Sequence, residues 1–174
     1  GVGSPNLIKR MREQVEQCYV EEGKDPSQIA LGVLRFVCVS DDQAVLDRYV
    51  SGARFQRRLA VSLRNRRETM VNDYMVAEVG SPEEPSLEEI SANIVVGNAE
   101  QVAARMCWEI ELYGPRHVNC YFAVGDMPNA AVKASMEAFA TKVVPMIEKH
   151  FGKPLAEICD APMPEPKPLQ MAAE

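Results

Sequence analysis

The stretch HVNCYFAVGDMP at residues 117–128 is the first place in this sequence where chemistry is expected. It opens as an apolar run typical of a strand covered on both faces, and it stops at a glycine, an acid and a proline. A segment with helical spacing follows directly, so strand, glycine turn and helix make half of a βαβ unit. In parallel α/β folds, functional groups gather where the carboxyl end of a strand meets such a turn. The turn at Gly125 and Asp126 is therefore the first candidate for a functional site.

The histidines and cysteines, which in other proteins often hold metals or act as nucleophiles, give no pattern of a metal site here. Only two histidines occur, His117 at the start of a strand and His150 at the end of a helix, so metal catalysis is not expected. His150 suits a helix carboxyl end, with Gly152 as the cap. The cysteines form no CxxC pair, and we interpret the first four as reduced thiols in or near the core. The five are Cys18, Cys38, Cys107, Cys120 and Cys159.

An arginine-rich run, RFQRRLAVSLRNRR at residues 54–67, invites a phosphate or nucleic-acid interpretation, because it holds six arginines and no acid. Against nucleic acid, its only aromatic residue is Phe55 and the whole chain carries a net charge of -6. A solvated helix face is favoured, although Arg54, Arg57 and Arg58 could also line a pocket mouth or a subunit contact.

Composition places the chain among soluble globular proteins. It has 174 residues, of which 47% are hydrophobic and 25% charged, and this length suits one domain. No apolar run approaches the roughly 18 residues needed to span a bilayer, and the first residues lack the pattern of a secretory signal. We therefore expect a cytoplasmic protein that binds neither membrane nor nucleic acid.

The elements that position the candidate turn alternate between helix and strand. In chain order we expect a helix at 4–22, a strand at 30–39, a helix from 41, a short apolar segment at 94–96, a helix capped by residues 98 and 101, a strand at 117–124, and a long helix kinked at 145. Arg35 is the one polar residue of its strand and needs a partner, so a paired structural arginine is favoured over a ligand-binding one.

The expected domain covers residues 1–152, with an insertion at 68–92 and a proline-rich mobile tail at 153–174. The insertion is either a surface loop with a short acidic helix at 86–90 or a lid or interface. Both long strands are apolar on both faces, and a sheet of two strands cannot cover them. Further strands must then come from a longer chain or from another copy.

The order of motifs resembles the carboxyl-terminal part of the luciferase-like flavin-dependent monooxygenases. The similar segments are GSPNLIKRMREQVEQCYVEEGKDPSQIAL, RFVCVSDD, NIVVGNAEQVAARM and HVNCYFAVGDMPNAAVKASMEAFATKVVPMI, which together cover roughly residues 3–150. The most specific piece is the VGNAEQVA turn and helix followed closely by the VNCYFAVGDMP strand.

This resemblance implies an α/β fold, the carboxyl-terminal part of a TIM (β/α)8 barrel, with two main parallel strands, 30–39 and 117–124, as its last two. It implies an enzyme that uses reduced FMN from a separate flavin reductase, together with O2, to oxidise a small organic substrate. Some relatives use a deazaflavin instead. The catalytic residues of the family lie upstream of Gly1, so none is assigned here.

The cofactor-binding candidates that the resemblance implies lie at the rim of the last strand. They are Phe122, Gly125, Asp126 and Met127, where a glycine permits close backbone approach and apolar side chains could wall the pocket. Each has a structural alternative: Gly125 may serve only the turn, Phe122 and Met127 may be core residues, and Asp126 may cap the final helix.

A rival hypothesis needs no catalysis. In it, the chain is a half-barrel module that binds a copy of itself or the remainder of the barrel, so a homo-oligomer is expected in either case. A nucleic-acid module using the arginine-rich run is a third and disfavoured hypothesis.

Overall fold

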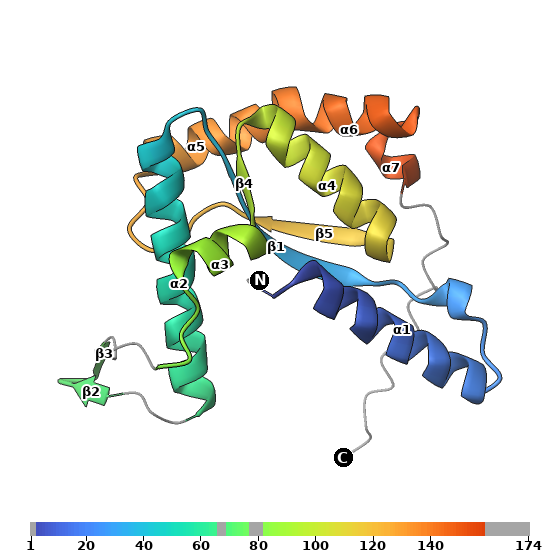
Figure 1. Ribbon diagram of the computed structural model, residues 1–174, viewed down its shortest axis with the longest axis horizontal. Coiled ribbons are helices and arrows are strands. Elements are labelled where there is room, and N and C mark those ends of the chain that lie inside the picture. The colour runs from blue at the N-terminus through green and yellow to red at the C-terminus, as the bar shows by residue number, and fades with distance from the viewer. Residues whose placement is uncertain (1–2, 66–68, 77–81, 159–174) are drawn as a thin grey trace, which may run out of the picture.

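The computed structural model describes residues 3–65, 69–76 and 82–158. Its centre is a sheet of three parallel strands in the order β4-β1-β5, with helices on both sides (Figure 1). The strands are β1 (Gly32–Val39), β4 (Val95–Gly97) and β5 (His117–Tyr121). The chain is therefore an α/β protein, as the sequence predicts.

The two neighbours of β1 pair with different halves of it. β5 runs alongside the first five residues, from Gly32↔His117 to Phe36↔Tyr121. β4 pairs with the last three, from Val37↔Val95 to Val39↔Gly97. The two main predicted strands are thus adjacent and parallel, and a short third strand lies on the far side of β1.

Helices and turns complete the described chain. The helices are α1 (Pro5–Glu21), α2 (Gln43–Arg64), α3 (Leu87–Asn93), α4 (Ala99–Tyr113), α5 (Asn129–Ala138), α6 (Val144–Phe151) and α7 (Leu155–Ile158). A 3-10 turn, η1, spans Pro26–Gln28, and a π-helical turn, η2, spans Phe139–Val143 between α5 and α6. This wide turn ends two residues before Pro145, whose ring disfavours regular helical hydrogen bonding, and it marks the place where the sequence predicts a kink.

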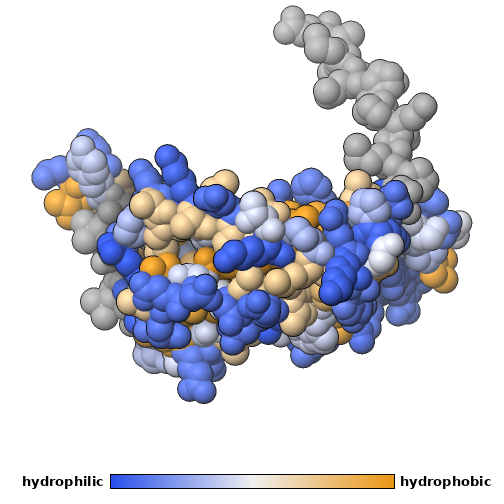
Figure 2. All heavy atoms as spheres, turned by 90° about the horizontal axis from the view of Figure 1, so that it is seen from above, coloured by the Kyte–Doolittle hydropathy of each residue, from blue (hydrophilic) through white to orange (hydrophobic). Residues whose placement is uncertain are grey.

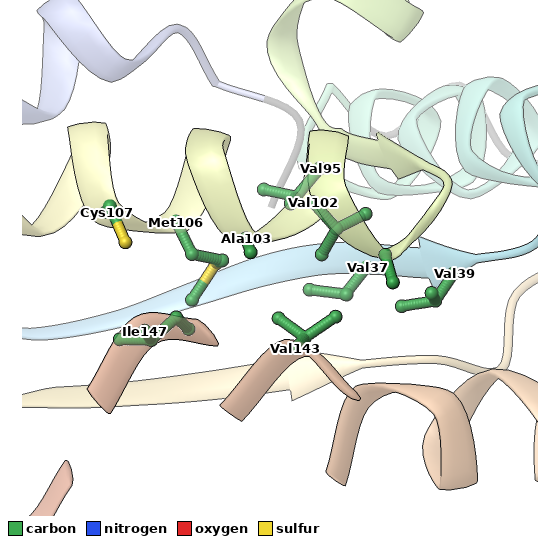
Figure 3. Close-up of a cluster of buried hydrophobic side chains, with 10 residues drawn as sticks. Val37, Val39, Val95, Val102, Ala103, Met106, Cys107, Val143 and Ile147 are labelled. Atoms are coloured by element: carbon green, nitrogen blue, oxygen red, sulfur yellow. The ribbon is translucent and has the colours of Figure 1, made fainter. Parts of the chain in front are cut away.

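Two apolar clusters cover the two faces of the sheet. On one face, Val37 and Val39 of β1 meet side chains of α4, η2 and α6, including Met106 and Ile147 (Figure 3). On the other face, neighbouring β1 residues meet α2 and α3. That second cluster contains Phe36, Cys38, Tyr49, Val50, Ala53, Ile90, Ile94 and Val124. The carboxyl half of β1 is therefore buried on both faces, as its apolar sequence predicts.

β5 departs from the prediction in length and in burial. It ends at Tyr121 rather than Val124, and its residues alternate between exposed and half-buried, starting with His117 exposed. The part of one face that carries Leu34 and Tyr121 is only partly covered, with these side chains 44% and 39% exposed. The expectation of a strand covered on both faces is therefore wrong for β5 within the described chain, because α2 and α3 cover this face around Phe36 and Cys38 and leave Leu34 and Tyr121 partly exposed.

The insertion contains a hairpin that the sequence did not reveal. β2 (Thr69–Val71) and β3 (Tyr74–Val76) pair antiparallel, and Asn72 and Asp73 between them have positive φ angles of 50° and 64°. Asparagine and aspartate tolerate this conformation and favour two-residue hairpin turns. Hydrophobic surface marks the end of the molecule where the hairpin lies (Figure 2), with Met70 and Val71 exposed. The predicted acidic helix at 86–90 is α3.

Arg35 is fully buried and paired, which confirms its structural interpretation. Its guanidinium donates to Glu109 Oε1 at 2.7 Å, to the Asn93 carbonyl at 2.6 Å and to the Gly3 carbonyl at 3.0 Å. Glu109 also accepts from Arg105 Nε at 2.8 Å and from the Tyr113 hydroxyl. One buried ion pair thus links β1 to α4, to the end of α3 and to the residues before α1.

The order of the strands in the sheet differs from the order that a (β/α)8 barrel requires. Consecutive strands of a (β/α)8 barrel lie side by side in chain order. Here β4 follows β1 in the chain but lies on the opposite side of β1 from β5. The described residues therefore form an open parallel sheet. Of the predicted tail at 153–174, residues 155–158 form α7, and residues 159–174 lie outside the described part.

Candidate functional site

An open cavity of about 550 Å³ lies between α2 and the carboxyl end of β5. Its lining residues are Ser51, Gly52, Phe55 and Gln56 from α2, and Tyr121, Ala123, Gly125 and Asp126 from the end of β5 and the turn after it. The helix that follows β1 covers one face of the sheet, whereas α5, which follows β5, packs toward the other (Figure 1). Adjacent parallel strands whose connections diverge in this way create a crevice, where α/β proteins often bind ligands.

Two glycines allow α2 to approach the turn closely. Gly125 has φ +56°, and a Cβ added to it would lie 2.9 Å from the Cα of Gly52. A Cβ added to Gly52 would lie 3.1 Å from the carbonyl oxygen of Val124. The Tyr49 hydroxyl donates to the Tyr121 carbonyl from the adjacent turn of α2. The backbones of the helix and the turn are thus in contact at the edge of the cavity, and the hydrogen bond from Tyr49 holds them there.

Asp126 forms a bidentate ion pair with Arg48 of α2. Arg48 Nη2 donates to Oδ2 at 2.7 Å, and Nε donates to Oδ1 at 3.1 Å. The hydrogen bond from Arg48 lowers the pKa of Asp126 below its ordinary value, so the carboxylate is charged at neutral pH. The alternative role of Asp126 as a helix cap is wrong, because the N-cap of α5 is Pro128 and no side chain caps it.

Aromatic side chains form part of the cavity wall. The Tyr121 ring packs on Phe36 with 5.3 Å between ring centroids, and its other side remains partly exposed toward the cavity. Phe55 lines the cavity from α2, and Ser51 and Gln56 add a hydroxyl and an amide. Polar and apolar groups thus contribute to this open wall in similar measure, so a ligand could make both ring contacts and hydrogen bonds here.

The structure brings together only half of the predicted site residues. Gly125 and Asp126 line the cavity, whereas Met127 packs half-buried against the cluster around Phe36. Phe122 lies on the opposite side of the sheet, edge-on to Phe139 at 5.5 Å between centroids. The core alternatives for Phe122 and Met127 are therefore confirmed.

The site residues that the sequence reasoning missed are of two kinds. Tyr121 and Ala123 alternate with Phe122 along the chain, so the two-residue period of a strand could have placed them on the cavity side. Phe55 and its neighbours on α2 gave no local signal, since their place depends on how α2 packs against a turn about 70 residues away.

Within the arginine-rich run, Phe55 and Gln56 line this cavity, whereas Arg54, Arg57 and Arg58 do not. Arg58 forms a bidentate pair with Glu84, with both nitrogen–oxygen distances at 2.7 Å. The pKa of Glu84 falls mainly through this hydrogen bond, and the charges of Arg54 and Arg57 lower it further. These three arginines are half-buried and do not line the cavity, so the alternatives of a solvated face and of a pocket mouth both fit poorly.

The remaining reactive groups lie outside the cavity. His150 is in the last turn of α6 before Gly152, as predicted, and its Nε2 lies 2.7 Å from Glu111 Oε1. Of the described cysteines, Cys38 is buried and Cys120 half-buried, and burial raises the pKa of each thiol to about 11. Cys18 is exposed, so its assignment to the core is wrong. Among residues 3–65, 69–76 and 82–158, no cluster of three metal-binding side chains occurs.

Comparison with known proteins finds a relative that is longer than this chain. The chain is 29% identical over 132 residues to the uncharacterized protein y4vJ of Sinorhizobium fredii (strain NBRC 101917 / NGR234). The matched region covers 76% of this chain and 38% of the relative, so the chain spans well under half of that protein. No protein-family model matches the sequence. In the described part of the chain, no helix combines the length and apolarity needed to cross a membrane.

Proposed function

We propose that this chain is the carboxyl-terminal part of a luciferase-like flavin-dependent monooxygenase. The observation that carries the proposal is the cavity at the carboxyl end of β5, with Tyr121 and Phe55 in its wall and a glycine turn at its edge. Its volume and its aromatic wall suit a planar heterocycle such as the isoalloxazine ring. The enzyme would take reduced FMN from a flavin reductase, or a deazaflavin, and oxidise a small organic substrate with O2.

The proposal includes a barrel that other segments complete. In it, β1 and β5 are the last two barrel strands, and β4 is a short addition at the end of β1. Support comes from the partly uncovered face that carries Leu34 and Tyr121, because all-parallel sheets are normally covered on both faces. Within the described residues β5 pairs with β1 alone, which leaves its other edge available to a further strand.

In this enzyme the described residues would form one wall of the site and would supply no catalytic group. A reduced flavin held there would supply the oxygen-activating chemistry. The Tyr121 and Phe55 rings would exclude water and orient the planar ligand, and the small residues Gly125 and Ala123 would let it approach the backbone. Proton-transfer groups would come from other strands of the proposed barrel.

Flavin titration of the purified chain tests this proposal. FMN fluorescence should be quenched on binding, and Tyr121→Ala and Phe55→Ala should each weaken binding by about tenfold, since an aromatic contact contributes about 0.5–1.5 kcal/mol beyond area burial. Tyr74→Ala is the matched control, because this aromatic residue lies in the exposed hairpin away from the cavity and should leave affinity unchanged.

A negative result would end the proposal. If the longer protein bound neither FMN nor reduced FMN, and showed no NADH-coupled oxygen use with a reductase, the oxygenase assignment would be abandoned.

A second candidate function is a non-catalytic assembly module, and the partly uncovered face of the sheet favours it. An apolar groove of about 280 Å³ lies between α1 and β1, and it includes the exposed side chains Met11, Val15 and Leu34. Such a surface suits another polypeptide. Native mass spectrometry distinguishes the two candidates, since a stable monomer without bound flavin or protein partner would refute assembly.

A further inference from the structure

The first helix, α1, carries an exposed apolar stripe that lies outside the cavity. Leu7, Met11 and Val15 follow one another at four-residue spacing, so they share one side of α1, and they are 45%, 58% and 44% exposed. The helix lies at the outside of the molecule (Figure 1), and another of its sides is bound to α4, where Arg12 donates to the Gly114 carbonyl at 2.6 Å. Large apolar side chains gathered on one surface mark a contact with another polypeptide.

The charged residues of α1 are segregated along its length. The basic residues come first, at positions 9, 10 and 12, and the acidic residues follow at positions 13, 16 and 21. The helix dipole favours the reverse order, because the amino end of a helix attracts negative side chains and the carboxyl end attracts positive ones. In the pairs Lys9–Glu13 and Arg12–Glu16 the basic residue also comes first, which is the weaker orientation. The stability of α1 by itself therefore does not explain the segregation.

A second copy of α1 in antiparallel orientation explains both features. A two-fold axis brings the two apolar stripes together, and it places the basic half of each helix beside the acidic half of the other. A parallel pair would instead place like charges side by side. The charge pattern is thus complementary to itself in the antiparallel orientation alone, which favours another copy of this chain over an unrelated partner.

We propose that the chain forms a symmetric dimer through α1, in which the stripes of Leu7, Met11 and Val15 pack together and the two helices run antiparallel. The exposed Arg10 and Glu21 lie about three helical turns apart, hence on the same side of α1, where each faces the opposite charge across the two-fold axis. This inference goes beyond the flavin chemistry and does not depend on it, since none of the described residues that line the cavity comes from α1.

Analytical ultracentrifugation of the purified chain, from about 1 to 100 µM, tests the dimer. We expect the wild type to dimerise reversibly, and Met11→Lys should weaken the dimer by more than about tenfold, because each dimer loses two apolar side chains from its interface. Met70→Lys is the matched control, since Met70 is also a methionine, is 57% exposed and lies on the hairpin. It should leave dimerisation unchanged, and unfolding curves verify that both variants are folded.

Charge reversal tests the antiparallel orientation. Arg10→Glu and Glu21→Lys should each weaken the dimer by about two- to fivefold, because each places like charges beside each other across the axis. The double variant restores opposite charges and should recover most of the loss. Added salt should weaken the wild-type dimer, since exposed charges are screened.

Three outcomes would overturn the inference. They are a chain that stays monomeric over this range, which would leave the stripe to another segment of a longer protein, a dimer that Met11→Lys leaves intact, and a double charge reversal without recovery. Flavin titration keeps the inference distinct from the proposed function, because Met11→Lys should bind FMN as the wild type does. A dimer that passes these tests but binds no flavin would overturn the proposed function alone.

Discussion

The close contact between α2 and the turn after β5 predicts that Gly125→Ala is strongly destabilising. Gly125 has φ +56°, where an L-residue costs about 1–2 kcal/mol. The new Cβ would also lie 2.9 Å from the Cα of Gly52, which is a backbone atom and cannot rotate away. Overpacking of this kind costs about 1–3 kcal/mol. We therefore expect the free energy of unfolding to fall by about 2–5 kcal/mol.

Gly152→Ala is the matched control, because it isolates the conformational part of this cost. Gly152 has nearly the same backbone angle, φ +68°, but a Cβ added there meets no atom within 4 Å. Its free energy of unfolding should fall only by the conformational cost of about 1–2 kcal/mol. Gly32→Ala, with no positive φ and no atom within 4 Å, should be close to neutral.

Equilibrium unfolding in urea measures all three variants, followed by circular dichroism and by the fluorescence of Trp108. The excess loss in Gly125→Ala over Gly152→Ala reports the steric cost at Gly52. Equal losses in these two variants would refute the reasoning, since they would mean that α2 does not approach the turn as closely as the structure shows. A parallel flavin titration should show weaker binding for Gly125→Ala and unchanged binding for Gly152→Ala.

Three further predictions concern groups outside the cavity. Arg35→Met should lower the free energy of unfolding, measured in urea, by about 1–3 kcal/mol, because Glu109 and the Asn93 carbonyl lose a buried donor. The loss should stay below that for an unpaired buried charge, since Arg105 and the Tyr113 hydroxyl still bind Glu109. The lowered pKa of Glu84 means that its ionised form stabilises the folded state. This contribution to the free energy of unfolding is complete above the unfolded pKa near 4.5, and it is lost as the pH falls through the lower folded pKa. The stability difference between wild type and Glu84→Gln should therefore shrink in unfolding curves below about pH 4.5. Iodoacetamide should label the exposed Cys18 rapidly, as peptide mass spectrometry would show. Cys120 is half-buried and its pKa is raised to about 11, so it should be labelled only on unfolding. Rapid labelling of both cysteines would contradict the burial of Cys120.

Local features of this fold were predictable from the sequence because neighbouring residues decide them. The Asn98 and Gln101 capping box starts α4, and Gly114 ends it in the left-handed conformation with φ 50°. The apolar β1 and the βαβα order followed from residue type and spacing. The need of Arg35 for a partner was equally clear, because an arginine among apolar strand residues must be paired.

Contacts between distant segments decided what the sequence left open. Glu109 is the partner of Arg35 because α4 packs across β1, and no spacing in the sequence indicates that pairing. The candidate site shows the same limit, since the prediction favoured Phe122 whereas the cavity side of the chain carries Tyr121.

The sequence by itself therefore determined the main helices, the strands β1 and β5 apart from the end of β5, the capping box of α4 and the turn at Gly125. Only the tertiary structure decided the strand order β4-β1-β5, the helix that lies against that turn and the side chains that form the cavity. The physical reason is that caps and turns are fixed by hydrogen bonds within a few residues. The cavity arises where Gly52 and Gly125 let two segments meet that lie far apart in the chain.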